Sequence, residues 1–181
     1  MLTITIPATE AFDESTGEFV YTKEQTLHLE HSLVSISKWE SKWCKPFLDK
    51  RNKTTEETID YVKCMTLNKG VSDETYNCLT NEHFSKINDY IGAPMTATYF
   101  YTNEKGKKGS NEQVTSELIY YWMIALNIPF ECQKWHLNRL LTLVRVCNLK
   151  NSPPKKMSKR DIMSRNAQLN AARKKQLNTR G

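Results

Sequence analysis

Residues 119–148 read IYYWMIALNIPFECQKWHLNRLLTLVRVCN, a stretch with a high density of large apolar side chains. These side chains recur at spacings of three and four residues, which is typical of helices that pack one face against a core. Ile128-Pro129 interrupts the pattern, and Pro129 suits the first turn of a new helix. The stretch therefore predicts an angled pair of core helices, one over Glu112–Asn127 and one from Pro129 to about Cys147.

The same spacing recurs toward the N-terminus, where it predicts a helix from Ser32 that ends near Pro46. Thr54 and Glu57 have the spacing of a capping box, so a second helix should begin there and stop near Gly70. Short helices are expected over residues 72–79 and 80–92. The apolar face of the helix from Ser32 comprises Leu33, Ile36, Trp39, Trp43 and Phe47.

The first 30 residues follow a different period. Leu2, Ile4 and Ile6 alternate with threonines, as in a half-buried strand, and residues 2–30 predict an antiparallel unit of two or three strands with a turn over residues 13–17. Residues 95–101, MTATYFY, are β-prone enough to return to this sheet. Residues 102–110 predict an exposed flexible loop.

These patterns together predict an α+β, predominantly α-helical fold. A small N-terminal antiparallel β element (residues 1–31) should pack on a helical body (residues 32–150), forming one globular domain over residues 1–150. Pro153 and Pro154 favour an extended linker. Residues 151–181 are therefore expected to form a linker and a basic tail, helical or disordered, with a possible helix from about Ser158 to Leu177.

Charge is distributed unevenly along the 181 residues, whose formal net charge is +6. Residues 150–181 hold ten Lys or Arg and one acid, which leaves 16 bases and 19 acids in residues 1–149. The sequence thus predicts a mildly acidic body with a basic tail, whose cations are available to phosphates or to a protein partner. The candidate residues of this basic tail are Lys155, Lys156, Lys159, Arg160, Arg165, Arg173, Lys174 and Lys175.

Cysteine and acidic residues give weak indications of metal binding. The five cysteines include no CxxC pair, so reduced thiols are expected. Cys132 and His136, four residues apart on an expected helix, could face one metal ion, but a core-facing helix with a small apolar thiol and a partly buried imidazole is the favoured explanation. His28 and His31 are interpreted as surface or boundary residues. Glu56, Glu57 and Asp60 could form a carboxylate group for a metal, but acids near the start of a helix stabilise the helix dipole, and this explanation is favoured.

Neither catalytic motifs nor export signals are evident. The phosphate-loop, dinucleotide, nucleophile-elbow and HExxH patterns are missing, so we expect a non-enzymatic protein with no catalytic residues, no metal and no cofactor. The first ten residues lack the basic start and apolar stretch of a signal peptide, and apolar stretches are too short for a membrane span. We therefore expect a soluble, unexported protein without membrane contact.

Three segments resemble the tail assembly chaperones of long, non-contractile-tailed bacteriophages. They are SISKWESKWCKPFL at Ser35–Leu48, the stretch at Ile119–Asn148 and the closing RNAQLNAARKKQLNTRG. The resemblance implies an assembly factor in the bacterial host cytoplasm that is absent from the mature virion. Its partners would be the tape measure protein and the tail tube protein, together with itself or a frameshifted longer form.

Binding would place helical surface of the tape measure protein in an apolar groove, with Met65, Met95 and Met123 as adaptable contacts if they are exposed. The candidate partner-binding residues are Trp39, Trp43, Tyr121, Trp122 and Trp135. Two other functions stay open. One is a nucleic-acid-binding phage protein, for packaging or regulation, that acts through the basic tail. The other is a minor structural protein of the virion.

Overall fold

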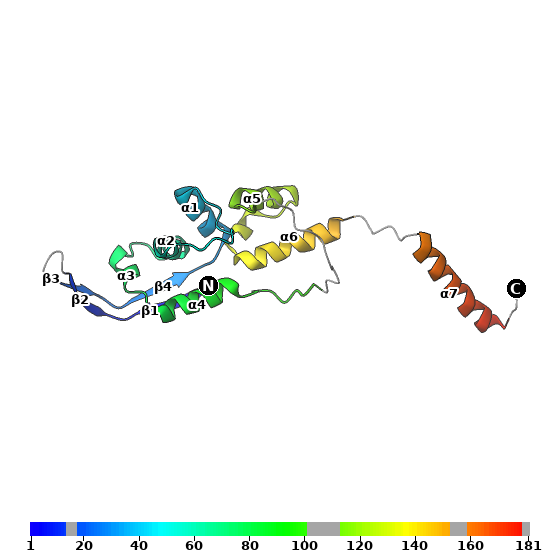
Figure 1. Ribbon diagram of the computed structural model, residues 1–181, viewed down its shortest axis with the longest axis horizontal. Helices are drawn as coiled ribbons and strands as arrows, with labels where there is room; N and C mark the ends of the chain where they lie inside the picture. Colours follow the sequence, from blue (N-terminus) through cyan, green and yellow to red (C-terminus); the bar gives the residue numbers. More distant parts are fainter. Residues whose placement is uncertain (14–17, 101–112, 153–158, 179–181) are drawn as a thin grey trace. The chain divides into compact units, whose positions relative to one another are not determined.

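The computed structural model describes residues 1–13, 18–100, 113–152 and 159–178. The chain divides into two compact units, Met1–Asn148 and Leu149–Gly181. In the first unit a β-hairpin precedes a set of helices (Figure 1), which confirms the predicted α+β, predominantly helical fold. Its strands are β1 (Leu2–Ile6), β2 (Thr9–Asp13), β3 (Glu18–Thr22) and β4 (Gln25–Leu29). The helices are α1 (Leu33–Trp43), α2 (Thr55–Met65), α3 (Asp73–Asn77), α4 (Asn81–Gly92), α5 (Ser116–Ala125), the 3₁₀ helix η1 (Phe130–Lys134), α6 (Leu137–Asn151) and α7 (Lys159–Leu177).

The four strands form one interrupted antiparallel ribbon, in which β1 pairs with β4 and β2 pairs with β3 (Figure 1). The register is continuous across the interruption, since Ile6 pairs with Gln25 and Thr9 pairs with Thr22. Pro7 lies in the interruption, and its missing N–H removes a donor from the ladder. The prediction of two or three strands was therefore wrong in number. The turn expected after β2 falls largely on residues 14–17, outside the described residues.

The capping box predicted at Thr54 is confirmed, and the helix predicted from Ser32 begins with a capping box as well. Ser32 exchanges side-chain and backbone hydrogen bonds with Ser35 at the start of α1, and Thr54 does the same with Glu57 at the start of α2. α1 ends at Cys44, which takes a left-handed conformation (φ 51°), two residues before Pro46. Capping bonds satisfy backbone N–H groups that the first turn of a helix leaves without partners.

The end of α2 differs from the expected position near Gly70. The helix stops at Met65 because the chain then runs along β4, where the Leu67 N–H donates to the His28 carbonyl over 2.8 Å. The Asn68 side chain adds two bonds to β4: its Oδ1 accepts from the His28 N–H over 2.7 Å, and its Nδ2 donates to the Thr26 carbonyl over 3.1 Å. These bonds to a strand replace the helical bonds that a longer α2 would make.

Two further expectations were wrong. Residues 95–100 form no strand, and residue 101 and the loop predicted over 102–110 lie outside the described residues. The single helix expected from Pro129 is divided into η1 and α6. Between them His136 forms a β-bridge with Ser32, and the Leu137 N–H donates to the His31 carbonyl over 2.8 Å. This pairing with a distant segment interrupts the helix.

The hydrophobic core joins the hairpin to α1, α2, α5 and α6, with one face of β1 and β4 turned inward. Its most deeply buried apolar residues are Ile4, Ile6, Leu27, Leu29, Leu33, Ile36, Trp39, Met65, Ile119, Met123, Leu137 and Leu140. The second unit contains α7, which confirms a helix near the predicted limits of Ser158 and Leu177. The paired prolines at 153 and 154 lie outside the described residues.

Candidate functional site

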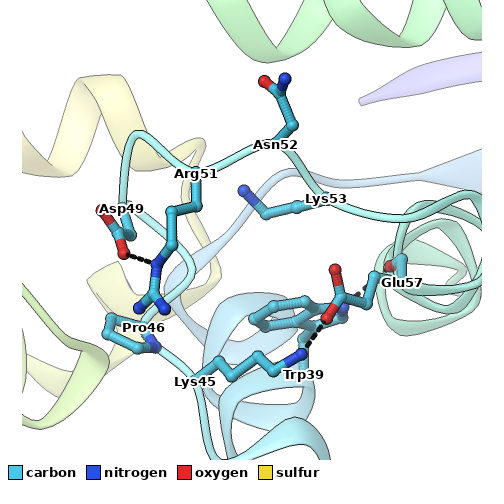
Figure 2. Close-up of a pocket in the computed structure, with 8 residues that line it drawn as sticks. All are labelled: Trp39, Lys45, Pro46, Asp49, Arg51, Asn52, Lys53 and Glu57. Carbon is cyan, nitrogen blue, oxygen red and sulfur yellow. Dashed lines mark hydrogen bonds and ion pairs between the residues drawn. The ribbon is translucent and has the colours of Figure 1, made fainter.

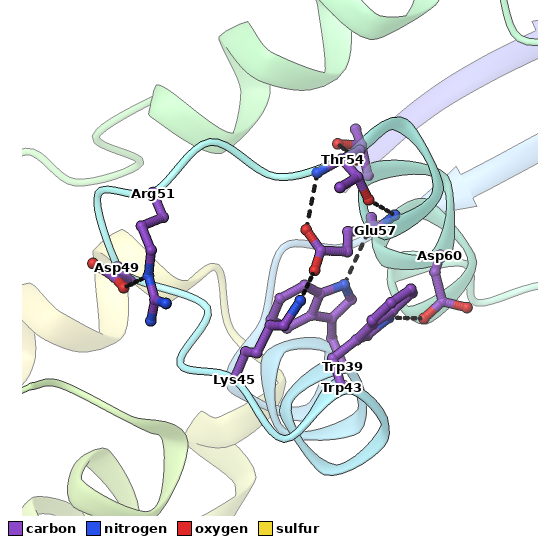
Figure 3. A network of polar contacts seen from close by, with 9 residues as sticks. Trp39, Trp43, Lys45, Asp49, Arg51, Thr54, Glu57 and Asp60 are labelled. Atoms are coloured by element: carbon purple, nitrogen blue, oxygen red, sulfur yellow. Dashed lines mark hydrogen bonds and ion pairs between the residues drawn. The ribbon is translucent and has the colours of Figure 1, made fainter.

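The α1 tryptophans face α2 and are held by its polar groups (Figure 3). Trp39 is only 1% exposed, and its indole Nε1 donates to the Glu57 carbonyl over 2.9 Å. Trp43 is half-buried and donates from Nε1 to Asp60 Oδ2 over 2.9 Å. Their ring centroids are 6.2 Å apart, in a stacked arrangement. The pair therefore fixes α1 against α2, and Trp39 offers little surface to a partner.

Lysines surround this tryptophan pair and neutralise two of the three acids of α2, Glu57 and Asp60. Lys45 Nζ lies 2.5 Å from Glu57 Oε1, and Lys42 pairs with Asp60. The hydrogen bond from Lys45 lowers the pKa of the Glu57 carboxyl most, and the bond from the Thr54 N–H lowers it further. Both lysines also lie within 6 Å of the Trp43 ring centroid, at 5.8 and 5.6 Å. The carboxylates of residues 57 and 60 are thus occupied by cations of the chain itself.

The remaining predicted aromatic residues lie on other elements. Tyr121 on α5 is 63% exposed, whereas Trp122 is half-buried beside Leu48 and Leu141 in an open groove. Trp135, between η1 and α6, is half-buried, with the Arg139 guanidinium carbon 4.2 Å from its ring centroid. The five predicted partner-binding residues therefore occupy three separate locations in the first unit.

Two exposed apolar residues were missed by the sequence analysis. Ile124 is 61% exposed one helical turn from Tyr121, and Phe130, in the stretch predicted to form core helices, is 53% exposed at the start of η1. Tyr120 joins the two elements: its hydroxyl donates to Gln133 Oε1 over 2.8 Å, and its ring lies 6.5 Å from that of Phe130. We call Tyr121, Ile124 and Phe130 the α5–η1 surface. The spacing of Tyr121 and Ile124 was the signal available in the sequence.

The methionines expected as adaptable contacts are mostly inaccessible. Met65 and Met123 are fully buried in the core, and Met95 is exposed. Two of the three are therefore packing residues of the first unit.

A buried histidine pair occupies the junction of β4, α1, η1 and α6. His31 is 2% exposed, which corrects its interpretation as a surface or boundary residue, and its ring centroid lies 5.1 Å from that of His136. His31 Nδ1 lies 2.5 Å from the Tyr61 hydroxyl, and His136 Nε2 lies 3.0 Å from the Tyr90 carbonyl oxygen. Burial, reinforced by the proximity of His136, lowers the pKa of His31 to about 4.

Cys132 and His136 do not share an α-helix, because Cys132 lies in η1 and His136 forms the bridge to Ser32, so their spacing of four residues does not place them on one helical face. In the part of the chain that the structure describes, no group of three or more His, Cys, Asp and Glu side chains is arranged to hold a metal ion.

The basic tail is described over α7. Six predicted cations, all with exposed side chains, lie on this helix: Lys159, Arg160, Arg165, Arg173, Lys174 and Lys175. Lys155 and Lys156 lie outside the described residues. The exposed apolar residues of α7 are Ile162, Met163, Leu169 and Leu177. The helix therefore presents both charge and scattered apolar side chains to solvent.

None of the helices over the described ranges has the length and apolar character required to cross a membrane. No protein-family model matches the chain, and neither a curated protein nor a solved structure matches it.

Proposed function

We propose that this chain is a non-enzymatic tail assembly chaperone of a long, non-contractile-tailed bacteriophage. In this role it binds the tape measure protein and helps to recruit tail tube subunits in the cytoplasm of the bacterial host, and it is absent from the mature virion. Self-association, or pairing with a frameshifted longer form, belongs to the same proposal. The observation that carries it is the α5–η1 surface, which lies within the segment Ile119–Asn148 on which the resemblance rests.

The physical argument concerns apolar helical surface. A tape measure protein that awaits its tube exposes such surface and aggregates unless it is covered. Tyr121, Ile124 and Phe130 are large apolar side chains, each more than half exposed. Their helices are anchored to the core, α5 through Ile119 and Met123 and η1 through Cys132. A rigid element that displays exposed aromatic and aliphatic groups suits helix binding, in which a few anchors supply most of the affinity.

Co-expression with the tape measure protein of the same phage tests the proposal. The wild-type chain should keep the tape measure protein soluble and co-purify with it. A Tyr121→Ser, Ile124→Ser, Phe130→Ser variant should lose this effect without losing its own fold, because these side chains are exposed. The matched control is Leu67→Ser, Tyr99→Ser, which removes two exposed apolar residues elsewhere. Unchanged solubility of the tape measure protein and no recovered complex would contradict the proposal.

Nucleic-acid binding is the second candidate, favoured by the exposed cations of α7. Phosphate contacts release counterions, so the affinity for DNA would fall steeply between 50 and 200 mM salt, roughly a thousandfold or more for six contacts. A DNA titration at several salt concentrations, with the full chain and with a chain that ends at Ser152, distinguishes the candidates. Salt-insensitive binding, or none, excludes this function. The third possibility, a virion protein, requires stoichiometric copies in mass spectra of purified particles.

A further inference from the structure

A small cavity lies between α1, α2 and the loop that connects them (Figure 2). Its volume is about 90 Å³, and the buried Trp39 ring forms part of its wall. Figure 2 shows Arg51 and Lys53 across the space from this ring. The lining residues are Trp39, Lys45, Pro46, Asp49, Arg51, Asn52, Lys53 and Glu57.

The charged groups of the cavity are not all paired. Lys45 Nζ lies 2.5 Å from Glu57 Oε1, and Arg51 Nε donates to Asp49 Oδ2 over 2.5 Å. Lys53 makes neither a hydrogen bond nor an ion pair with any of the described residues. Its ammonium instead lies over aromatic rings, 4.2 Å from the centroid of Phe47 and 5.8 Å from that of Trp39.

The surroundings of Lys53 disfavour its charge. The side chain is half-buried, and this burial lowers the pKa of its amine, although the acids at 57 and 49 oppose the shift. An ammonium removed from water loses solvation that aromatic faces replace only in part. A carboxylate beside it would restore the missing charge partner through a charge-assisted hydrogen bond.

Size and charge limit the group that can enter. Cofactor and drug-sized sites generally measure about 300–1,000 Å³, so a space of about 90 Å³ admits a single small group. Three cations and two carboxylates line it, which leaves one positive charge in excess. A singly charged carboxylate matches this excess, whereas a phosphate dianion would meet Asp49 and Glu57 with a surplus of negative charge.

We propose that this cavity binds the carboxylate of an acidic side chain of a partner protein, with Lys53 as its main contact and Arg51 as a second cation. Trp39, Lys45 and Pro46 belong to the segment Ser35–Leu48 that carries the resemblance, so the site deepens the proposed function and rests on it for the protein nature of the partner. The site can be tested without the tape measure protein, and failure of the two proposals is therefore distinguishable.

Nuclear magnetic resonance titration of the full chain tests the site with two blocked tripeptides, acetyl-Gly-Glu-Gly-amide and its Gln analogue, at constant ionic strength. The Glu peptide should shift the Trp39 indole N–H and the Lys53 Cε resonances saturably, with an affinity of about millimolar for a ligand of this size. It should also raise the pKa of Lys53, measured from the Cε shift. The Gln peptide should leave both resonances unchanged.

Three variants, together with acetate and inorganic phosphate as small anionic probes, complete the experiment. Lys53→Gln should weaken binding of the Glu peptide about tenfold or more, because the charge-assisted bond is lost, and Arg51→Gln should weaken it less. Lys69→Gln, at an exposed lysine that does not line the cavity, is the matched control and should bind normally. Acetate should compete with the Glu peptide. Equal binding of both peptides, tighter binding of inorganic phosphate than of acetate, or full binding by a folded Lys53→Gln variant would each overturn the proposal.

Discussion

At the scale of single residues, a buried acid connects three parts of the first unit. Glu40 on α1 is buried, and its Oε1 accepts from the Phe47 N–H over 2.8 Å, while its Oε2 accepts from the Ser116 N–H over 2.7 Å. The second bond gives an acceptor to the backbone N–H of Ser116, the first residue of α5. A negative charge at this end of a helix is also favoured by the helix dipole. One carboxylate thus positions both the loop beside the cavity and the helix that carries Tyr121.

Replacing Glu40 with Ala should destabilise the protein by about 3 kcal/mol, because two buried N–H groups lose a charged acceptor. Urea unfolding followed by tryptophan fluorescence measures this change. Lys38→Ala is the control, since this exposed residue lies on the same helix, and its effect should stay within about 0.5 kcal/mol. Equal stability of the two variants would show that the Glu40 bonds contribute nothing net.

The histidine pair predicts a second residue-scale effect, on the pH dependence of stability. The ionisable groups around it are Tyr61, Tyr90 and Glu30, and Glu30 also receives the Tyr90 hydroxyl and the N-terminal amine. Burial lowers the pKa of His136 as well as that of His31. Both rings are therefore neutral in the folded protein at pH 7, and each takes up a proton at higher pH in the unfolded chain than in the folded one.

The stability contribution of His31 should be fully present above pH 6.5, its unfolded pKa, and should be lost progressively as pH falls toward its folded pKa of about 4. At pH 5 the loss relative to pH 7.5 is about 2 kcal/mol from this residue. Urea unfolding at the two pH values measures it. His31→Gln should reduce the difference, whereas His83→Gln, which removes a histidine of α4, should not. A stability that is flat over this range contradicts the buried neutral pair.

Local patterns predicted the cap at Thr54, because a capping box depends on residues three positions apart. They did not predict the burial of His31 or the exposure of Phe130. His31 is buried by Tyr61 and His136, which are 30 and 105 positions away in the sequence. Phe130 lies in the stretch whose apolar density predicted core helices, but it falls in η1, which turns differently from the α-helix that was expected there. The cavity around Lys53 likewise requires two helices and their loop.

At the scale of elements, pairing between distant segments limits helix length. β4 is bonded on one side to β1, and on the other to the chain after α2 through Met65, Leu67 and Asn68. Asn68 bonds to β4 with both the oxygen and the nitrogen of its side-chain amide, as a short third strand would with its backbone. The sequence pattern of α2 continued to favour a helix to Gly70, and only the bonds to β4 explain its earlier end.

Asn68→Ala should expose that edge of β4. Loss of two hydrogen bonds to partly buried backbone groups should destabilise the protein by about 2 kcal/mol. Hydrogen exchange at the His28 amide, whose acceptor is Asn68, should accelerate in proportion if exchange occurs by local opening. Asn77→Ala on α3 provides a control at an exposed asparagine. In this variant the His28 amide should exchange at the wild-type rate. An unchanged His28 rate in Asn68→Ala would exclude a role for this side chain at the strand edge.

At the scale of the whole molecule, the division into two units coincides closely with the division of charge. The first unit ends at Asn148, and the excess of basic residues begins at Lys150. A net charge of +6 thus belongs to neither part: the body is mildly acidic and the tail strongly basic. The excess of basic residues and the α5–η1 surface therefore lie in different segments, and each can be removed without the other.

A chain that ends at Ser152 should unfold with the same free energy as the full chain, within about 0.5 kcal/mol, because the side chains described on α7 are exposed. It loses nine Lys or Arg and one Asp, so it should no longer bind a cation-exchange matrix at neutral pH, where the full chain is retained. If the α5–η1 surface supplies the main contact with the tape measure protein, this shorter chain should still keep that protein soluble. Loss of solubilisation with unchanged stability would instead assign the main contact to α7 and require a proposal in which the basic tail, rather than the helical body, recognises the partner.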